Sequence, residues 1–255
     1  MWGLEASYPL VRAQRENLYL GLALDEKRFL NYAAKLAASD YRSLALSWSL
    51  SGNRFDDLAG GGASSGNLTL SQGHLQLEGA AQQATDALST QTAGDYRKLR
   101  YSLARQQTIT DALLLLMSFS GQWTDQNLDS SERFSLGGST GVRAYPSGEG
   151  AGAIGRVASA ELRWQVSAPL VWSVFFDSGN VTVNARNDYR GASALNSYAL
   201  SGAGLAVVWQ VNRRTHARLT WARRQGDNPN PTLTGRDQDG TRVLDRVWAS
   251  VAVGF

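Results

Sequence analysis

Hydrophobic and polar positions alternate along most of this chain. In VASAELRWQV, residues 157–166, alanine, leucine, tryptophan and valine take every second position from 158, and mostly polar residues fill the positions between. The same period of two recurs in DYRKLRYSLARQ (95–106), THARLTWA (215–222) and RVWASVAVGF (246–255). A period of two is typical of β-strands with one apolar face, so the pattern predicts an all-β protein.

The alternating segments predict about eleven strands. Their ranges are 3–12, 16–29, 40–53, 65–79, 95–107, 110–123, 156–167, 169–179, 197–211, 213–224 and 242–255. Most are longer than the usual five or six residues of a globular strand, and they are close to the roughly 9 to 11 residues with which a tilted strand crosses a bilayer. In NLTLSQGHLQLEG the alternation changes phase at Gly73, which predicts a β-bulge there.

The connections between these strands are of two kinds that largely alternate along the chain. Tight ones contain LVRAQREN, TITD, SAPL and VNRRT, and long polar or glycine-rich ones cover 79–94, 124–155, 180–196 and 225–241. Short turns at one end and long loops at the other are typical of outer-membrane β-barrels. The connection RFDDLAGGGASSG (54–66) is longer than expected for the short-turn side.

A soluble β-sandwich or lipocalin-like barrel would show the same alternation with its apolar face inside. Strand length, the charges on the polar face and the terminal Phe255 favour a transmembrane barrel instead. In such a barrel the tryptophans are expected in aromatic girdles at the membrane interfaces. They are Trp2, Trp48, Trp123, Trp164, Trp172, Trp209, Trp221 and Trp248.

Composition narrows the possible functions. The 255 residues carry a formal charge of +3, which is too small to indicate nucleic-acid binding. There is no cysteine, no apolar run of the roughly 18 residues that a membrane helix needs, and no signal peptide is expected from the opening residues. The two histidines lack metal-ligand spacing, and GEGAGAIG lacks the Lys-Ser/Thr ending of a phosphate loop. No G-x-S-x-G nucleophile elbow appears, because the two stretches with these letters, GASSG and GGSTG, open no predicted helix. We therefore predict no enzyme, no metal site and no cofactor.

Three motifs, in order, decide the class. The stretch GQWTDQNLDSSERFSLGGSTGVRAYPSGEGAG contains the tip Val142, Arg143, Ala144 and Tyr145. ASAELRW follows with a glutamate at position 161, and then VFFDSGNV. Together they resemble the C-terminal barrel of two-partner-secretion transporters, the haemolysin secretion/activation proteins of ShlB/FhaC/HecB type. The opening LEASYPLVRAQRENLYLGLAL also resembles this family, so the resemblance covers essentially the whole chain.

The resemblance implies a role for the glycine-rich loop at about 133–156. In this family it is the sixth extracellular loop, which folds back into the lumen, and its arginine contacts the acidic residue of an F-x-D-x-G strand. Carried over, Arg143 would pair with Asp177, and Glu161 would lie on the lumen side nearby. The alternation agrees, because Asp177 is in phase with Ser173 and opposite to Phe176.

Other positions carry over in the same way. The wall motif contains Phe175 and Gly179, and Phe255 matches the terminal aromatic that the barrel-assembly machinery recognises. Ala144 is a departure, since glycine is commoner there, and it limits backbone freedom at the tip. The resemblance implies a bacterial outer-membrane pore, embedded in outer-membrane lipid, that moves a large secreted exoprotein of haemolysin or adhesin type without nucleic-acid partners.

Counting strands raises one difficulty. The family's sixth loop joins strands eleven and twelve of sixteen, whereas about six predicted strands precede it here. We therefore expect residues 1–255 to be about the last eleven strands of a barrel truncated at its N-terminus, without the first strands and the periplasmic POTRA domains. A barrel-assembly-type insertion factor, a non-functional fragment and a diffusion porin remain as alternatives, and the presence of the VR tip disfavours the porin.

Overall fold

The computed structural model describes residues 1–33 and 36–254, and most of these form one antiparallel sheet. Its eleven strands are β1 (Trp2–Arg12), β2 (Glu16–Ala33), β3 (Leu36–Asp56), β4 (Gly62–Leu77), β5 (Gly94–Thr110), β6 (Leu113–Thr124), β9 (Ile154–Ser167), β10 (Leu170–Thr182), β11 (Ser197–Asn212), β12 (Thr215–Arg224) and β13 (Asp245–Val253). Each lies at the place that the alternation predicts.

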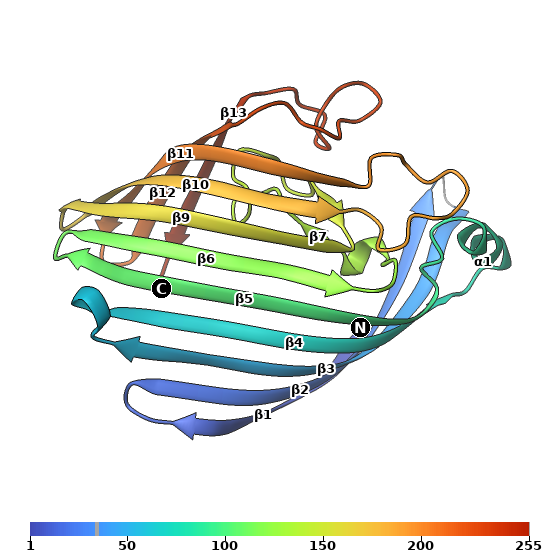
Figure 1. Cartoon of the computed structure of the whole chain (residues 1–255), viewed down its shortest axis with the longest axis horizontal. Coiled ribbons are helices and arrows are strands. Elements are labelled where there is room, and N and C mark those ends of the chain that lie inside the picture. Colours follow the sequence, from blue (N-terminus) through green and yellow to red (C-terminus); the bar gives the residue numbers. More distant parts are fainter. Residues whose placement is uncertain (34–35, 255) are drawn as a thin grey trace.

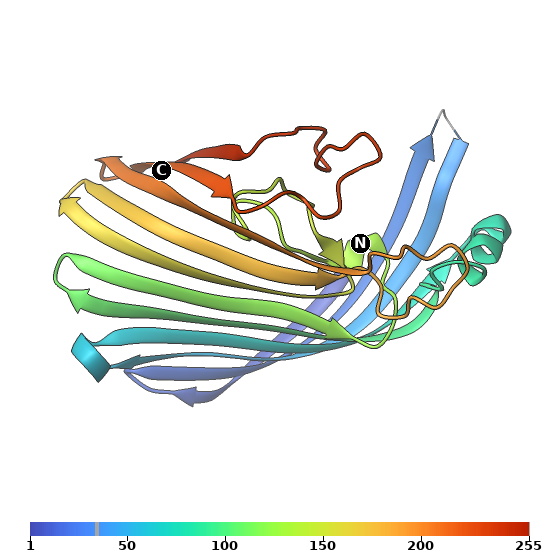
Figure 2. The same ribbon diagram turned by 45° about the horizontal axis from the view of Figure 1, so that its top comes forward.

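The sheet curls into an open trough. Each strand pairs with the next one along the chain, and β6 pairs with β9 across the long segment between them. Figures 1 and 2 show the strands side by side and strongly curved, with β1 at one rim and β13 at the other. The predicted antiparallel barrel architecture is confirmed as one part of a barrel wall. Within the described residues β1 and β13 do not pair, so the sheet is not closed.

Short turns gather at one end of the trough and long loops at the other (Figure 1). The connections at the turn end are residues 13–15, 57–61, 111–112, 168–169 and 213–214. The prediction of a long connection at 54–66 is wrong, because β3 and β4 extend into it and leave only a 3₁₀ turn, η1 (Leu58–Gly60). Gln107 on β5 holds that turn by donating to the carbonyl oxygens of Leu58, Ala59 and Gly61.

The apolar side chains face outward. Leu103 on β5 is 59% exposed, Trp164 on β9 is 56% exposed and Val247 on β13 is 61% exposed. A soluble sandwich or lipocalin-like barrel would bury such residues, so these exposures favour a lipid-facing outer surface. The inner face carries charged and polar groups instead, including buried Lys98 on β5 and Glu161 on β9.

The bulge predicted at Gly73 does not form. β4 pairs in unbroken register with β3 and β5 through this residue. The phase change has another cause: Leu68 and Leu70 point outward, whereas Leu75, nearer the loop end, points inward and is buried. Gly73 leaves room on the inner face for the ring of Tyr96.

The loop end carries the remaining elements. Helix α1 (Ala80–Ala87) stands beyond β4, and residues 125–153 contain the 3₁₀ turn η2 (Ser130–Glu132) and the short pair β7 (Phe134–Ser135) and β8 (Ala151–Gly152). Figures 1 and 2 show this segment, drawn in yellow-green, inside the trough. Within the described part of the chain, no helix is long and apolar enough to span a membrane.

Candidate functional site

The candidate site is the segment that lies inside the trough, residues 125–153, which we call the in-folded loop. Its backbone is ordered by its own hydrogen bonds. The amide of Val142 donates to Leu136, that of Gly138 donates to Tyr145, and that of Tyr145 donates to Val142. Gly138 has a φ of +115°, which a residue with a side chain rarely adopts. The glycines therefore allow a compact double turn that presents residues 142–145 at its tip.

The tip is seated on the inner face of the last strands. Val142, Ala144 and Tyr145 are buried and belong to one apolar cluster. The strand residues of that cluster are Phe175 and Val181 on β10, Leu200 and Ala206 on β11, and Ala222 on β12. The sequence predicts the tip residues themselves, but the packing partners on β11 and β12 could not be chosen from it.

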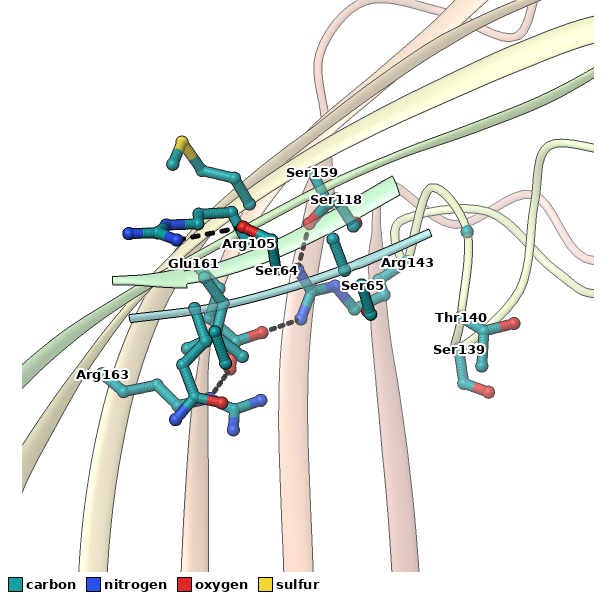
Figure 3. Close-up of a pocket in the computed structure, with 16 residues that line it drawn as sticks. Ser64, Ser65, Arg105, Ser118, Ser139, Thr140, Arg143, Ser159, Glu161 and Arg163 are labelled. Carbon is teal, nitrogen blue, oxygen red and sulfur yellow. Dashed lines mark hydrogen bonds and ion pairs between the residues drawn. The ribbon is translucent and has the colours of Figure 1, made fainter. Parts of the chain in front are cut away.

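Arg143 points from the tip into a cluster of acceptors on β9 and β10. Its Nε and Nη2 donate to the two carboxylate oxygens of Asp177 over 2.9 and 2.8 Å, and its backbone amide also donates to Asp177 over 3.1 Å. Its Nη1 donates to Glu161 over 2.6 Å and Nη2 to the hydroxyl of Ser159 over 3.1 Å (Figure 3). The guanidinium lies 3.4 Å from the ring centre of Phe175. This is a bidentate, charge-assisted contact with a second carboxylate beside it.

The two carboxylates have further partners. Asp177 is fully buried and also accepts from the hydroxyl of Ser159. Glu161 accepts from Arg163 over 2.8 Å and lies 3.3 Å from a nitrogen of Arg218. Three arginines thus share two carboxylates, so the cluster carries a net positive charge. All four carboxylate oxygens have a donor, which is the condition for burying charge in a protein.

The charge of Arg143 is secure in this setting. Burial by itself lowers the pKa of a guanidinium, but the hydrogen bonds and charges of Asp177 and Glu161 outweigh it and raise the pKa of Arg143 above its ordinary value. Arg143 therefore stays protonated throughout the physiological range.

Comparison with known proteins agrees with this geometry. The sequence profile of the haemolysin secretion/activation protein family, ShlB/FhaC/HecB, matches residues 2–207. The chain belongs to this family. Its members are β-barrel proteins of the bacterial outer membrane, which confirms the resemblance, the class and the location predicted from the sequence.

Two solved structures are similar in fold. CdiB from Escherichia coli superposes with a TM-score of 0.76 at 19% identity, over 99% of this chain and 45% of that chain. CdiB from Acinetobacter baumannii superposes with a TM-score of 0.50 at 11% identity, over 98% of this chain and 50% of that chain. The chain thus spans about half the length of these two proteins. A comparison with curated proteins finds no match.

Ala144 stands where the resemblance leads us to expect glycine, and β11 accommodates its methyl group. A Cβ placed on Gly202 would lie 2.5 Å from the Cβ of Ala144, so the methyl group of Ala144 occupies the space that a side chain at 202 would need. Two residues on, Gly204 leaves room for the ring of Phe175, which would meet an added Cβ at 2.5 Å. Gly179 likewise leaves room for the side chain of Leu136 in the loop, whose Cδ2 would lie 2.7 Å from a Cβ added at 179.

Trp248 makes a contact that the sequence did not predict. Its indole nitrogen donates to the carbonyl oxygen of Arg143 over 2.7 Å, so it points into the trough from β13. The girdle prediction is therefore wrong for Trp248, and the other seven tryptophans are exposed on the outer face. The sequence did contain a signal for this inward position. Trp248 lies between the outward-facing Val247 and Ala249, so the alternation of the strand places its side chain on the opposite, inner face.

The base of the in-folded loop has its own anchor. Glu132 forms a buried ion pair with Lys98 on β5 and lies 3.6 Å from Lys27 on β2. Gln122 on β6 donates to the carbonyl oxygens of Glu132 and Ala153, which joins the two ends of the loop. Because these partners come from distant parts of the chain, the alternation shows only that they face the lumen.

Asn127 links three loops at the outer end. Its amide nitrogen donates to the carbonyl oxygens of Thr90 and Arg186, and its side-chain oxygen accepts from the amide of Arg186. Phe255, the expected assembly signal, lies outside the described residues. Within the residues that the structure describes, no group of three or more acidic or histidine side chains is placed to hold a metal ion.

Proposed function

We propose that this chain is the C-terminal part of an outer-membrane pore that passes a large partner exoprotein, of haemolysin or adhesin type, to the cell surface in two-partner secretion. Membership of the haemolysin secretion/activation family supports the transport role. The outward apolar face supports a setting in outer-membrane lipid. The in-folded loop lies in the space through which the exoprotein would pass. In this proposal, the contacts that attach the loop to the barrel wall therefore control whether the exoprotein can pass.

The trough is proposed to be one part of a larger barrel, completed by strands, and served by periplasmic POTRA domains, that lie outside these residues. The unpaired edges of β1 and β13 support this, because lipid offers no hydrogen bonds to open strand edges. Residues 1–255 produced alone should therefore give no folded, heat-modifiable barrel in the outer membrane. A heat-modifiable band from this segment would refute the proposal.

The main observation behind the proposed role of the loop is the buried contact of Arg143 with Asp177 and Glu161. We propose that this contact is a latch that holds the in-folded loop, with Val142, Ala144 and Tyr145 as its apolar seat. Removing one partner of a buried ion pair costs about 3–5 kcal/mol, since the remaining charge is left without compensation. Loss of Arg143 would leave Asp177 buried with only the hydroxyl of Ser159 as side-chain donor, whereas Glu161 keeps Arg163 and Arg218, so the loop would lose its position.

The test uses the full-length transporter with Arg143→Ala, and it measures exoprotein in the medium relative to folded transporter in the outer membrane. Secretion should fall strongly while the amount of heat-modifiable barrel stays near that of the parent. Arg156→Ala is the matched control, because Arg156 is an exposed arginine on β9 whose Nε donates to Asn180 and not to this cluster. Normal secretion by the Arg143→Ala transporter would refute the latch.

A further inference from the structure

A second set of contacts lies on the outer side of the tip and involves neither Asp177 nor Glu161. It centres on Arg224, the last residue of β12, and on residues 225–244, which we call the outer loop. Figures 1 and 2 show the outer loop, in orange-red, rising between β12 and β13 at the rim of the trough.

Arg224 and Asp237 form a buried ion pair within this region. Both are nearly inaccessible to solvent, and the guanidinium donates to the two carboxylate oxygens over 3.2 and 2.5 Å. Asn228 donates to the same carboxylate over 3.0 Å, and Arg224 also donates to the carbonyl oxygen of Val243. Arg224 thus fastens the middle and the end of the outer loop to β12.

The same guanidinium touches the in-folded loop. Its central carbon lies 4.9 Å from the ring centre of Tyr145, within the range of a cation–π contact. Tyr145 is the last residue of the tip and is almost fully buried. Arg224 therefore connects the two loops directly.

The outer loop then closes over Glu149. The carboxylate of Glu149 is fully buried and accepts from the amide of Gln238 over 2.9 Å, whereas its other oxygen has no hydrogen-bond partner among the described residues. From β13, Arg246 donates to Asp239 over 2.9 Å and to the hydroxyl of Thr241 over 2.9 Å. The outer loop is thus pinned at both strands that it joins, with Gln238 seated on the in-folded loop.

We propose that the outer loop is a lid over the in-folded loop, locked by the Arg224–Asp237 pair. Arg224 is a positioning residue that acts on the outer loop through Asp237. The lid proposal rests on the proposed function only because both concern the in-folded loop: the contact of Arg143 is its first attachment, and the lid is a second one. Because the latch of Arg143 and the lock of Arg224 use different carboxylates on different elements, each can open while the other stays closed.

The test follows two cysteine reporters in the full-length transporter, which is feasible because this chain contains no cysteine. Glu149→Cys, the lid reporter, samples the space under the lid, and Val142→Cys, the tip reporter, samples the tip; both parent side chains are fully buried. Intact cells are treated with a membrane-impermeant maleimide, and the rate of labelling is measured without reference to secretion. The lid is therefore tested even if the latch of Arg143 proves unnecessary for transport.

Arg224→Ala should raise the labelling rate of the lid reporter by about tenfold or more, while the tip reporter stays protected. Asp237 loses its paired hydrogen bonds with Arg224 and keeps as counter-charge only Arg246, whose guanidinium lies 3.8 Å away. Asp237→Asn should act in the same direction, and Arg224→Lys should recover part of the protection because it keeps the charge but not the paired hydrogen bonds. Arg223→Ala is the matched control, since Arg223 is the neighbouring residue on β12, is exposed, and pairs with Asp245 on β13.

Three results would overturn the lid. Unchanged labelling of the lid reporter in both Arg224→Ala and Asp237→Asn would show that the pair does not hold the outer loop. Rapid labelling of the tip reporter as well as the lid reporter would show that Arg224 belongs to the seat of the tip and not to a separate lock. An equal effect of Arg223→Ala would also contradict the assignment.

Discussion

Replacing Gly202 by alanine should unseat the tip of the in-folded loop. The new Cβ would lie 2.5 Å from the Cβ of Ala144 and 3.1 Å from the carbonyl oxygen of Arg223. Carbon atoms pack at about 3.5–4.0 Å, so the tip would have to retreat by about 1 Å. The contacts of Arg143 with Asp177, now 2.8 and 2.9 Å, would lengthen to about 3.8 Å, which is beyond hydrogen-bond range.

The size of the effect follows from this overlap. Overpacking a well-filled site costs about 1–3 kcal/mol, which corresponds to a factor of about 5 to 150 in the docking equilibrium of the tip. The assay is the labelling rate of the tip reporter, Val142→Cys, by an impermeant maleimide, together with secretion by the full-length transporter. Gly202→Ala should raise the labelling rate by that factor and lower secretion.

A compensating substitution makes the test decisive. Ala144→Gly removes the methyl group that the new Cβ meets. Ala144→Gly alone removes one methyl group from the apolar seat, worth about 0.8 kcal/mol, and should raise the labelling rate by no more than about fourfold. The double variant Gly202→Ala/Ala144→Gly should recover protection of the tip reporter to that level. If the double variant is labelled as fast as Gly202→Ala, the seat on β11 does not depend on Ala144 and the reasoning is wrong.

Three further predictions concern the other anchors of the loop. Trp248→Phe removes the donor to the carbonyl oxygen of Arg143 and should cost about 0.5–1.5 kcal/mol of tip docking, seen as faster labelling of the tip reporter; an unchanged rate would contradict the role. Glu132→Gln leaves Lys98 buried without its counter-charge and should lower the unfolding temperature of the barrel on semi-native gels, whereas an unchanged temperature would count against the base anchor. Asn127→Ala should speed proteolysis of residues 79–93 and 183–196 on intact cells, and equal protection would show that Asn127 does not link these loops.

The alternation predicted the strands and which residues share a face, while strand length, the charges on the polar face and the terminal Phe255 favoured lipid on the apolar side. A strand in a barrel wall must turn one face to lipid and the other to the lumen, and the structure has Leu103 and Trp164 exposed on the outer face. The pairing of Arg143 with Asp177 came from the family resemblance, and parity agreed with it. The structure places them in contact, while the role of that contact remains our proposal.

The other anchors of the two loops could not be predicted, because they depend on contacts between residues that are distant in the chain, which a single sequence does not specify. Many polar residues face the lumen, and alternation alone gives no reason for Lys98 to meet Glu132 or for Arg224 to meet Asp237. Trp248 was misplaced because the preference of tryptophan for membrane interfaces outweighed a parity that pointed inward. The bulge at Gly73 was wrongly predicted because the change of phase marks where the strand passes from lipid to the covered loop end.

The most direct test of the central claim is a double-variant cycle between Arg143 and Asp177. Secretion by the full-length transporter is measured for Arg143→Ala, Asp177→Ala and the double variant, each relative to folded barrel in the outer membrane. If the two residues act as one latch, the double variant should secrete no less than the more impaired single variant. If the two losses multiply, the residues act independently, and the contact seen in the lumen does not hold the loop for transport.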